Sequence, residues 1–303
     1  MKITVLCGGP SAERRVSLVS GQAVAAALAR AGHQVRKADI GPDNLRALDY
    51  PADVIFPVLH GWFGESGELQ AILEKRRLAF VGSGSRASRL GMDKAAAKRV
   101  WAAHGLPTPP WKVITRDARR KMDSAALPAP CVVKPLDSGS SIDVSVCLTP
   151  QQAARAVRRL LERYGRALVE KFIEGAEITV GLLEEKPLDP IRIITSRSFF
   201  DYKAKYQDKT TRHCFHTGLP YRVVQQCRWL AKRAADILGA RDLSRVDIMV
   251  DRDMRPWLLE INTIPGFTPK SLLPEAARHA GIPFERLVDR LVKRAYLRRW
   301  RES

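Results

Sequence analysis

The sequence lacks the features that mark membrane and secreted proteins. No uninterrupted apolar run approaches the roughly 18–20 residues that are needed to span a bilayer, and the mean hydropathy is −0.20. The N-terminus has no charged segment ahead of its apolar run and turns polar at Gly8. Such a start is typical of a first β-strand rather than of a signal peptide. We therefore expect neither secretion nor insertion into a membrane.

Cysteine is scarce, and its spacing excludes the usual metal fingers. The chain has five cysteines, which form neither a CxxC pair nor the spacing of a zinc finger. An odd number of cysteines in apolar surroundings is typical of reduced, packed thiols. The cysteines therefore indicate a cytoplasmic protein.

Acidic residues are also few. The 303 residues include 51 Lys and Arg but only 32 Asp and Glu, which gives a net charge of +19 and an isoelectric point near 10.1. Such a surplus is found in proteins that bind nucleic acid, but also in enzymes of anionic substrates such as nucleotides. The basic residues are spread along the chain and become denser only from residue 286 to 301. We therefore do not expect nucleic acid as the primary partner.

Alternating strands and helices predict an α/β fold. In the first part of the chain, the hydrophobic pattern predicts strands at residues 3–7, 34–40, 53–59 and 78–81 and helices at residues 16–30 and 69–75. This alternation is typical of a parallel, doubly wound sheet.

Two further blocks of predicted elements follow. The second has helices at residues 95–103 and from Thr149 onward, the latter with the residues of a capping box, and strands at 131–134, 167–172 and 177–183. The third has strands at 191–196, 246–250 and 257–261 and a final amphipathic helix at 283–300, whose basic face we expect to be solvated. We divide the chain into residues 1–93, 94–178 and 179–303.

Two segments of the first block place polar side chains where open α/β sheets bind ligands. The Gly-rich turn after the first strand contains neither GxGxxG nor GxxxxGK[ST], so neither standard nucleotide fingerprint applies. Glu13 in this turn either holds a substrate ammonium group or is simply an acid in the first turn of a helix. His60 ends a strand in a Gly-rich loop, and both a binding role and a structural role stay open for it.

The segment from Val132 to Asp143 has the composition of a phosphate-binding loop. Lys134 ends a strand, and the Gly and Ser residues after it supply N–H and O–H donors that can surround phosphates. Further on, residues 169–172 end a strand with a surface suited to an adenine, and Glu177 is placed to accept hydrogen bonds from a ribose.

Oxygen-bearing side chains on two adjacent strands predict a Mg²⁺ site. Asp247, Glu260 and Asn262 point the same way because side chains alternate between the faces of a strand. Three hard oxygen donors with room for water and phosphate suit Mg²⁺. Arg245 shares the face of Asp247, where it would stabilise charge on a reacting acyl oxygen.

Together these motifs resemble the D-alanine–D-alanine ligase family of the ATP-grasp superfamily, over essentially the whole chain. Six segments stand in the family's order and approximate spacing, namely GGPSAERRVS, HGWFGESGELQ, VGSGSRASRLGMDK, DYKAKY, RVDIMVD and EINTIPGFTPKSLLP. The resemblance implies an ATP-grasp fold after the N-terminal domain, with ATP and two Mg²⁺ ions (or Mn²⁺) as cofactors. It also implies that ATP phosphorylates one D-alanine, that the amine of a second attacks the acyl phosphate, and that the dipeptide serves peptidoglycan synthesis. A homodimer is expected from the resemblance alone.

The resemblance assigns residues to the nucleotide and the metal. Lys94 and Lys134 would hold the phosphates of ATP, and Lys205 would reach its γ-phosphate. The adenosine pocket would be lined by Glu170, Lys171, Phe172, Glu177 and Leu259. The two metal ions would be bound by Asp247, Glu260 and Asn262.

The resemblance also assigns residues to the amino acids. Glu13 would bind the ammonium group of the first D-alanine, and the acyl centre would be surrounded by His60, Arg245 and Gly266. The second D-alanine would be received by Ser271 and Leu272. Glu13, Ser140 and Tyr206 match a hydrogen-bonded trio that ties a mobile loop over the site.

The chain departs from the family pattern at two places. Asp143 stands where the phosphate loop usually has a glycine, and His216 and Thr217 follow where a Pro-Ala pair is usual. We predict that the charge of Asp143 weakens ATP binding by repulsion. The alternative is that Asp143 turns outward and pairs with an arginine.

Two alternative functions stay open. The second substrate is D-lactate or D-serine in one of them, and in the other the chain is a weakened paralogue that only binds nucleotide or anionic polymers. Tyr206 favours an amine as the nucleophile, because a neutral phenol offers no cation to the carboxylate of D-lactate.

Overall fold

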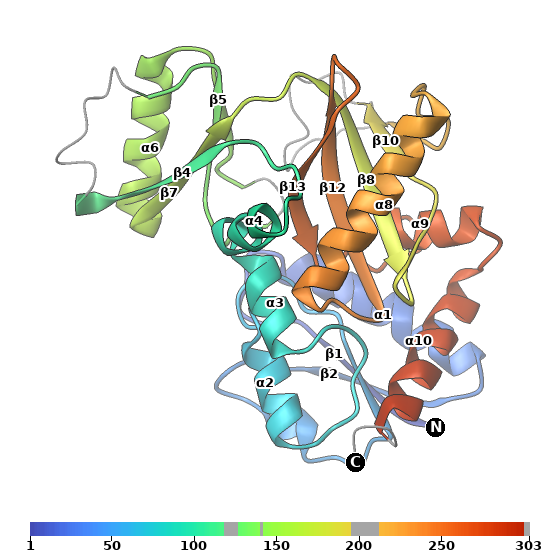
Figure 1. The fold of residues 1–303 in the computed structure, drawn as a ribbon. Helices are drawn as coiled ribbons and strands as arrows, with labels where there is room; N and C mark the ends of the chain where they lie inside the picture. The colour runs from blue at the N-terminus through green and yellow to red at the C-terminus, as the bar shows by residue number, and fades with distance from the viewer. Residues whose placement is uncertain (118–126, 140–141, 195–211, 300–303) are drawn as a thin grey trace.

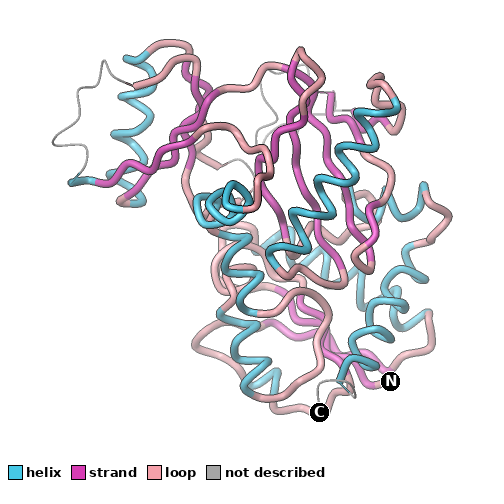
Figure 2. Tube along the Cα trace, viewed as in Figure 1, coloured by secondary structure: helices cyan, strands magenta, loops and turns pink. Residues whose placement is uncertain are grey.

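The computed structural model describes residues 1–117, 127–139, 142–194 and 212–299. They form three β-sheets with helices packed against them (Figures 1 and 2). This mixture of helices and sheets confirms the predicted α/β class. Within these ranges, no helix combines the length and the apolar character that are needed to cross a membrane.

The N-terminal sheet is parallel and has the strand order β2–β1–β3. Its strands are β1 (Lys2–Cys7), β2 (Gln34–Asp39) and β3 (Val54–Pro57). Val5 and Leu6 are neighbours in β1, yet Val5 packs in a cluster with α1 (Arg14–Arg30) and Leu6 in a cluster with α2 (Glu68–Lys75). Helices therefore cover both faces of the sheet, which confirms the doubly wound arrangement.

The chain beyond α2 differs from the prediction. The prediction of a strand at residues 78–81 is wrong, because this segment joins β3 through only one isolated parallel bridge, between Phe80 and Ile55. The segment leaves the sheet at Gly82, whose backbone N–H donates a 2.8 Å hydrogen bond to Asp242 Oδ2. The short helices η1 (Arg46–Leu48) and α3 (Ser85–Met92) were not predicted.

A second, antiparallel sheet has the order β4–β7–β5–β6. Its strands are β4 (Trp111–Thr115), β5 (Cys131–Lys134), β6 (Ser145–Cys147) and β7 (Arg166–Lys171), and α6 (Pro150–Tyr164) covers one face. The predicted capping box at the start of α6 is confirmed: Thr149 Oγ1 accepts from the Gln152 N–H at 3.3 Å, and Gln152 Oε1 accepts from the Thr149 N–H at 3.2 Å. The edge strands β4 and β6 were not predicted.

The third sheet is antiparallel, with the order β11–β10–β8–β12–β13 and with β9 beside β8. These strands are β8 (Gly175–Leu183), β9 (Lys186–Pro187), β10 (Ile191–Ile194), β11 (Arg212–Cys214), β12 (Leu243–Asp251) and β13 (Pro256–Asn262). One face packs on α4 (Lys94–Ala103) and α8 (Tyr221–Leu238) through Trp101, Cys227 and Leu230. Arg245 and Asp247 lie on the opposite face. The helices α8 and α9 (Leu272–His279) and the strand β11 were not predicted.

The last helix, α10 (Phe284–Arg299), returns to the N-terminal sheet and lies beside α1 (Figure 1). Its predicted apolar stripe is confirmed, because Leu287, Val288 and Leu291 are buried in the cluster that contains Val5. The prediction of a solvated basic face is wrong for three residues of this helix. These residues are Arg290, Arg294 and Arg298, and they form ion pairs with Glu184, Glu185 and Asp242.

Candidate active site

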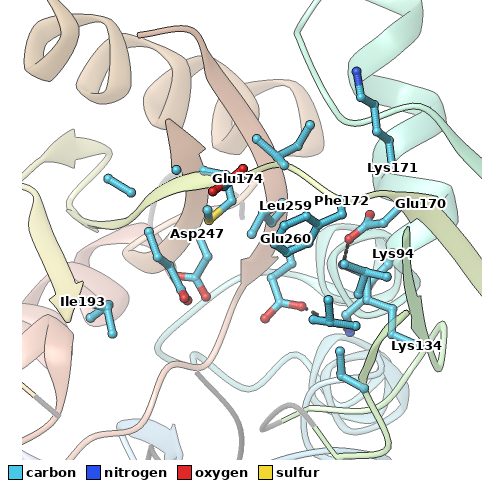
Figure 3. Close-up of a pocket in the computed structure, with 18 of the residues that line it drawn as sticks. Lys94, Lys134, Glu170, Lys171, Phe172, Glu174, Ile193, Asp247, Leu259 and Glu260 are labelled. Atoms are coloured by element: carbon cyan, nitrogen blue, oxygen red, sulfur yellow. Dashed lines mark ion pairs between the residues drawn. The ribbon is translucent and has the colours of Figure 1, made fainter. Parts of the chain in front are cut away.

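A cavity of about 500 Å³ lies between the second and third sheets (Figure 3). Its walls come from β5, β6 and β7 on one side and from β8, β10, β12 and β13 on the other. Nine of the residues that the sequence singled out line it, namely Lys94, Lys134, Glu170, Lys171, Phe172, Glu177, Asp247, Leu259 and Glu260. The structure thus brings together segments that are up to 166 residues apart in the chain (94 to 260).

A smaller cavity of about 80 Å³ adjoins the first and is more polar. It shares Lys94, Ser138 and Glu260 with the larger cavity. Loops of the N-terminal sheet meet the third sheet here, and the predicted site residues among the walls of this cavity are Glu13, His60, Lys94, Arg245, Glu260, Asn262 and Gly266.

Strand register places the predicted metal ligands on one face. Asp247 of β12 lies directly opposite Glu260 of β13, and Arg245 lies opposite Asn262. Since directly opposed residues of an antiparallel pair share a face, the common orientation predicted from the two-residue alternation is confirmed. Figure 3 shows Asp247 and Glu260 reaching from these neighbouring strands into the same cavity.

The side chain of Asp247 is held by two neighbours. Arg245 donates from Nε to Asp247 Oδ1 at 3.0 Å and from Nη2 to Oδ2 at 2.9 Å, and Thr179 Oγ1 donates to Oδ1 at 2.6 Å. A carboxylate accepts about four hydrogen bonds, so Oδ2 keeps one lone pair. The two hydrogen bonds to Asp247 also hold the guanidinium group of Arg245 at the wall of the small cavity.

The donor set suits Mg²⁺. In the described part of the chain, no three His, Cys, Asp or Glu residues are grouped as metal ligands, so the set is two carboxylates and the amide of Asn262. Asn262 Oδ1 accepts from the Ile264 N–H at 3.0 Å and retains a second lone pair. Mg²⁺ is usually bound by one or two carboxylates together with substrate phosphates. Asp247, Glu260 and Asn262 therefore fit an ion that is shared with a phosphate group.

Four charged side chains are grouped on the opposite side, where Lys94, Lys134 and Glu170 line the cavity and Lys98 is buried behind them. Lys94 Nζ donates to the Ser138 carbonyl at 2.8 Å and lies 3.4 Å from Glu260 Oε2. Lys134 Nζ lies 2.5 Å from Glu170 Oε1, and Lys98 Nζ lies 2.9 Å from Glu170 Oε2. Burial opposes the charge of Glu170, but the two lysines outweigh burial and hold its pKa below the usual value.

Sequence reasoning missed Lys98. It lies four residues after Lys94 and three before the buried Trp101, so its position on the buried face of α4 was a detectable signal.

Glu13 and His60 face the small cavity. Glu13 is nearly buried, and a Cβ atom added to Gly139 would lie 3.0 Å from Glu13 Oε2. His60 Nδ1 lies 3.7 Å from Glu65 Oε1, while Glu65 Oε2 accepts from the Gly61 N–H at 2.6 Å. Burial alone would lower the pKa of His60, but the carboxylates of Glu65 and Glu13 outweigh burial and raise it. Glu65 was not predicted, although it lies in the Gly-rich loop that drew attention to His60.

The remaining predicted residues lie elsewhere. Ser271 and Leu272 line neither cavity: Ser271 is the N-cap residue of α9, with Oγ 2.9 Å from Thr268 Oγ1, and Leu272 packs against the core. Ser140, Lys205 and Tyr206 lie outside the described residues.

Asp143 turns away from the large cavity. Its Oδ2 atom accepts from Arg163 Nη1 at 2.8 Å and from the Tyr164 hydroxyl at 2.6 Å. Burial and the adjacent carboxylate raise the pKa of Tyr164 to about 12, so this phenol remains a donor. The structure therefore shows the outward alternative and gives no support to the predicted repulsion of ATP. The backbone φ of Asp143 is +59°, a value that favours glycine.

Comparison with known proteins gives a consistent result. A family model described as "D-ala D-ala ligase C-terminus" matches residues 100–293. The D-alanine–D-alanine ligase of Gloeobacter violaceus is 43% identical over 300 residues, which cover 97% of this chain and 99% of that protein. The D-alanine–D-alanine ligase of Methylococcus capsulatus is 41% identical over 297 residues, which cover 97% and 96%.

Solved structures show the same similarity. The structure of the D-alanine–D-alanine ligase from Bacillus anthracis superposes with a TM-score of 0.86 at 30% identity, and each chain is covered completely. A structure of that ligase complexed with ATP has a TM-score of 0.83 at 28% identity, again with complete coverage. The similarity therefore extends over nearly the whole chain, in sequence and in fold.

Proposed function

This chain belongs to the D-alanine–D-alanine ligase family, and we propose that it uses ATP to join two molecules of D-alanine into D-alanyl-D-alanine. The observation that carries the proposal is the meeting of two cavities at Lys94, Ser138 and Glu260. The larger has the size and the lysines for a nucleotide, and the smaller offers both a carboxylate and a guanidinium, as a zwitterionic amino acid requires. The amino acid's carboxylate would then lie beside the γ-phosphate.

In the first step, the carboxylate of one D-alanine attacks the γ-phosphorus of ATP, which gives an acyl phosphate and ADP. Lys94 and Lys134 neutralise phosphate charge, and Lys205 is assigned to the γ-phosphate. Phosphoryl transfer depends chiefly on positioning and charge neutralisation, to which these cations contribute. Asp247, Glu260 and Asn262 would hold two Mg²⁺ ions, which would supply further neutralisation of phosphate charge.

The adenosine moiety occupies the part of the large cavity next to Lys134, whose Nζ atom lies 2.5 Å from Glu170 Oε1. Its walls there would be Glu170, Lys171, Phe172, Glu177 and Leu259. Phe172 and Leu259 provide apolar surface for the base, and Glu177 is assigned to the ribose hydroxyls.

In the second step, the amine of another D-alanine attacks the acyl carbon, inorganic phosphate leaves, and the amine loses a proton. Glu13 holds the ammonium group of the first D-alanine, which fixes the acyl centre beside Arg245, His60 and the backbone of Gly266. Arg245 stabilises the negative charge that develops on the acyl oxygen. Ser271 and Leu272 are assigned to the second D-alanine, and Glu13, Ser140 and Tyr206 to closure of the site, which protects the acyl phosphate from water.

The wider assignments follow from this activity. The dipeptide would enter peptidoglycan synthesis and so maintain cell shape, and the use of ATP together with five free thiols supports a cytoplasmic location. We retain the division into residues 1–93, 94–178 and 179–303, and the homodimer stays a prediction.

The test is an assay of ADP release by the purified protein. We expect release only when ATP, Mg²⁺ and D-alanine are all present, with D-alanyl-D-alanine as the product by mass spectrometry. Parallel reactions with D-alanine plus D-lactate or D-serine test the alternative second substrates. D-Alanyl-D-lactate as the main product would refute the amine preference assigned to Tyr206, and ATP binding without turnover would indicate the weakened paralogue.

A further inference from the structure

Lys98 is a buried cation that the proposed reaction does not use. Its side chain has no exposed surface, and it lines neither cavity. Lys98 Nζ donates a 2.6 Å hydrogen bond to Thr108 Oγ1 and lies 2.9 Å from Glu170 Oε2. Burial of a lysine is costly unless the charge is paired. Here burial outweighs the attraction of Glu170 and lowers the pKa of Lys98 to about 8, so that it is mainly protonated at neutral pH.

The charges around Glu170 explain what Lys98 contributes. Glu170 is 3% exposed and lies between the ammonium groups of Lys98 and Lys134. With one carboxylate and two ammonium groups, this trio carries a net charge of +1. Without Lys98, Glu170 would neutralise Lys134, and the wall that faces the phosphates would lose its positive charge at this point.

The same hydrogen bonds tie the trio to the metal-binding strand. Thr108 Oγ1, which accepts from Lys98, donates to the Leu258 carbonyl at 2.9 Å, and the Leu258 N–H donates to the Pro107 carbonyl at 2.9 Å. Leu259 and Glu260 follow directly in β13 and line the large cavity. Lys98 therefore links α4, β7 and β13 at the base of this cavity.

We propose that Lys98 is a positioning residue for the nucleotide: it compensates the charge of Glu170 and so leaves the ammonium group of Lys134 to attract the phosphates of ATP. The inference rests on the proposed function, because it requires ATP in the large cavity. It differs from a purely structural role, since it concerns the affinity for nucleotide and not only the stability of the fold.

The experiment compares ADP binding, measured by calorimetry with Mg²⁺ present, among three variants and the unaltered protein. Lys98→Met removes the charge and keeps an unbranched side chain. Lys98→Met combined with Glu170→Gln removes both charges and leaves the +1 of Lys134. Lys112→Met on β4 removes an exposed lysine from the second sheet and serves as the matched control.

We expect Lys98→Met to weaken ADP binding at least tenfold and to raise KM for ATP in parallel, with KM for D-alanine changed less than twofold. The double variant should bind ADP at least threefold more tightly than Lys98→Met, and Lys112→Met should not differ from the unaltered protein. If Lys98→Met does not fold, which circular dichroism would detect, Lys98→Gln, which also removes the charge, replaces it in both comparisons with the same criteria.

Two results would overturn the proposal: ADP affinity unchanged in Lys98→Met, or a double variant that binds ADP no more tightly than Lys98→Met. Failure of the proposed function is distinguishable, because the unaltered protein itself would then not bind ADP or not turn over D-alanine.

Discussion

Replacing Asp143 distinguishes between two roles of its carboxylate, repulsion of ATP and outward pairing with Arg163 and Tyr164. In the structure, the carboxylate is occupied by Arg163 and Tyr164, so Asp143→Gly should change KM for ATP less than twofold. A carboxylate about 6 Å from a phosphate would instead cost roughly 3 kcal/mol at an effective dielectric constant near 20. Its removal would then lower KM more than about 100-fold, or several-fold if solvent intervened.

The stability of the same variants gives a second, independent readout. The pair with Arg163, whose side chain is 62% exposed, contributes at most about 1 kcal/mol, and the hydrogen bond from Tyr164 contributes about 1.5 kcal/mol. Glycine relieves about 1 kcal/mol of strain at the positive φ. Asp143→Gly should therefore lower the free energy of unfolding by about 1 to 1.5 kcal/mol, or Tm by a few degrees.

The assay measures KM for ATP at low and high salt, together with Tm, for Asp143→Gly and Asp143→Asn. Asparagine tolerates positive φ and still accepts from Tyr164, so Asp143→Asn should be the more stable of the two variants. Lys134→Met is the control that shows whether the assay detects a loss of affinity. A fall in KM of fivefold or more in both Asp143 variants, larger at low salt, would refute the outward assignment.

Three further changes have defined outcomes. Glu260→Ala should reduce kcat more than tenfold while the circular dichroism spectrum is retained, and a smaller loss, below about 1.4 kcal/mol, would contradict the metal assignment. Asp242→Ala removes a fully buried carboxylate that pairs with Arg294 and Arg298, and it should lower the free energy of unfolding by about 3–5 kcal/mol in urea unfolding, whereas Arg30→Gln at an exposed pair should lower it by less than about 1 kcal/mol. Because Glu65 helps to raise the pKa of His60, the stabilisation by protonated His60 is complete below pH 6.5 and is lost as the pH rises through the pKa in the folded state. The Tm difference between the unaltered protein and His60→Gln should therefore narrow as the pH rises from 6.5 through the pKa of His60 in the folded state, and a Tm difference that does not change with pH would contradict this.

Much of the candidate site could be predicted because its residues lie at strand ends or alternate along a strand. Asp247, Glu260 and Asn262 share a face for the simple reason that β12 and β13 are neighbouring extended strands. Lys134 was recognisable because it ends a strand before a Gly- and Ser-rich loop. In both cases, the local sequence was sufficient to predict where the side chain lies.

The residues that escaped prediction are defined by contacts between distant segments. The role of Lys98 depends on its ion pair with Glu170, which is 72 residues away in the chain, and the periodicity of α4 does not identify that pair. The basic face of α10 was predicted to be solvated, because the sequence does not show that Glu184 and Asp242 pair with it. These two acids lie in separate turns of the third sheet. The orientation of Asp143 likewise depended on Arg163, at the far end of α6.

The central claim is that this chain activates one D-alanine as an acyl phosphate and transfers it to a second. The most direct test uses D-alanine labelled with ¹⁸O in both carboxylate oxygens, with ATP and Mg²⁺, and measures the released phosphate by mass spectrometry. Attack of a carboxylate oxygen on the γ-phosphorus and later expulsion of phosphate place one ¹⁸O atom in each phosphate per dipeptide formed. Phosphate without ¹⁸O, released while dipeptide accumulates, would contradict the account.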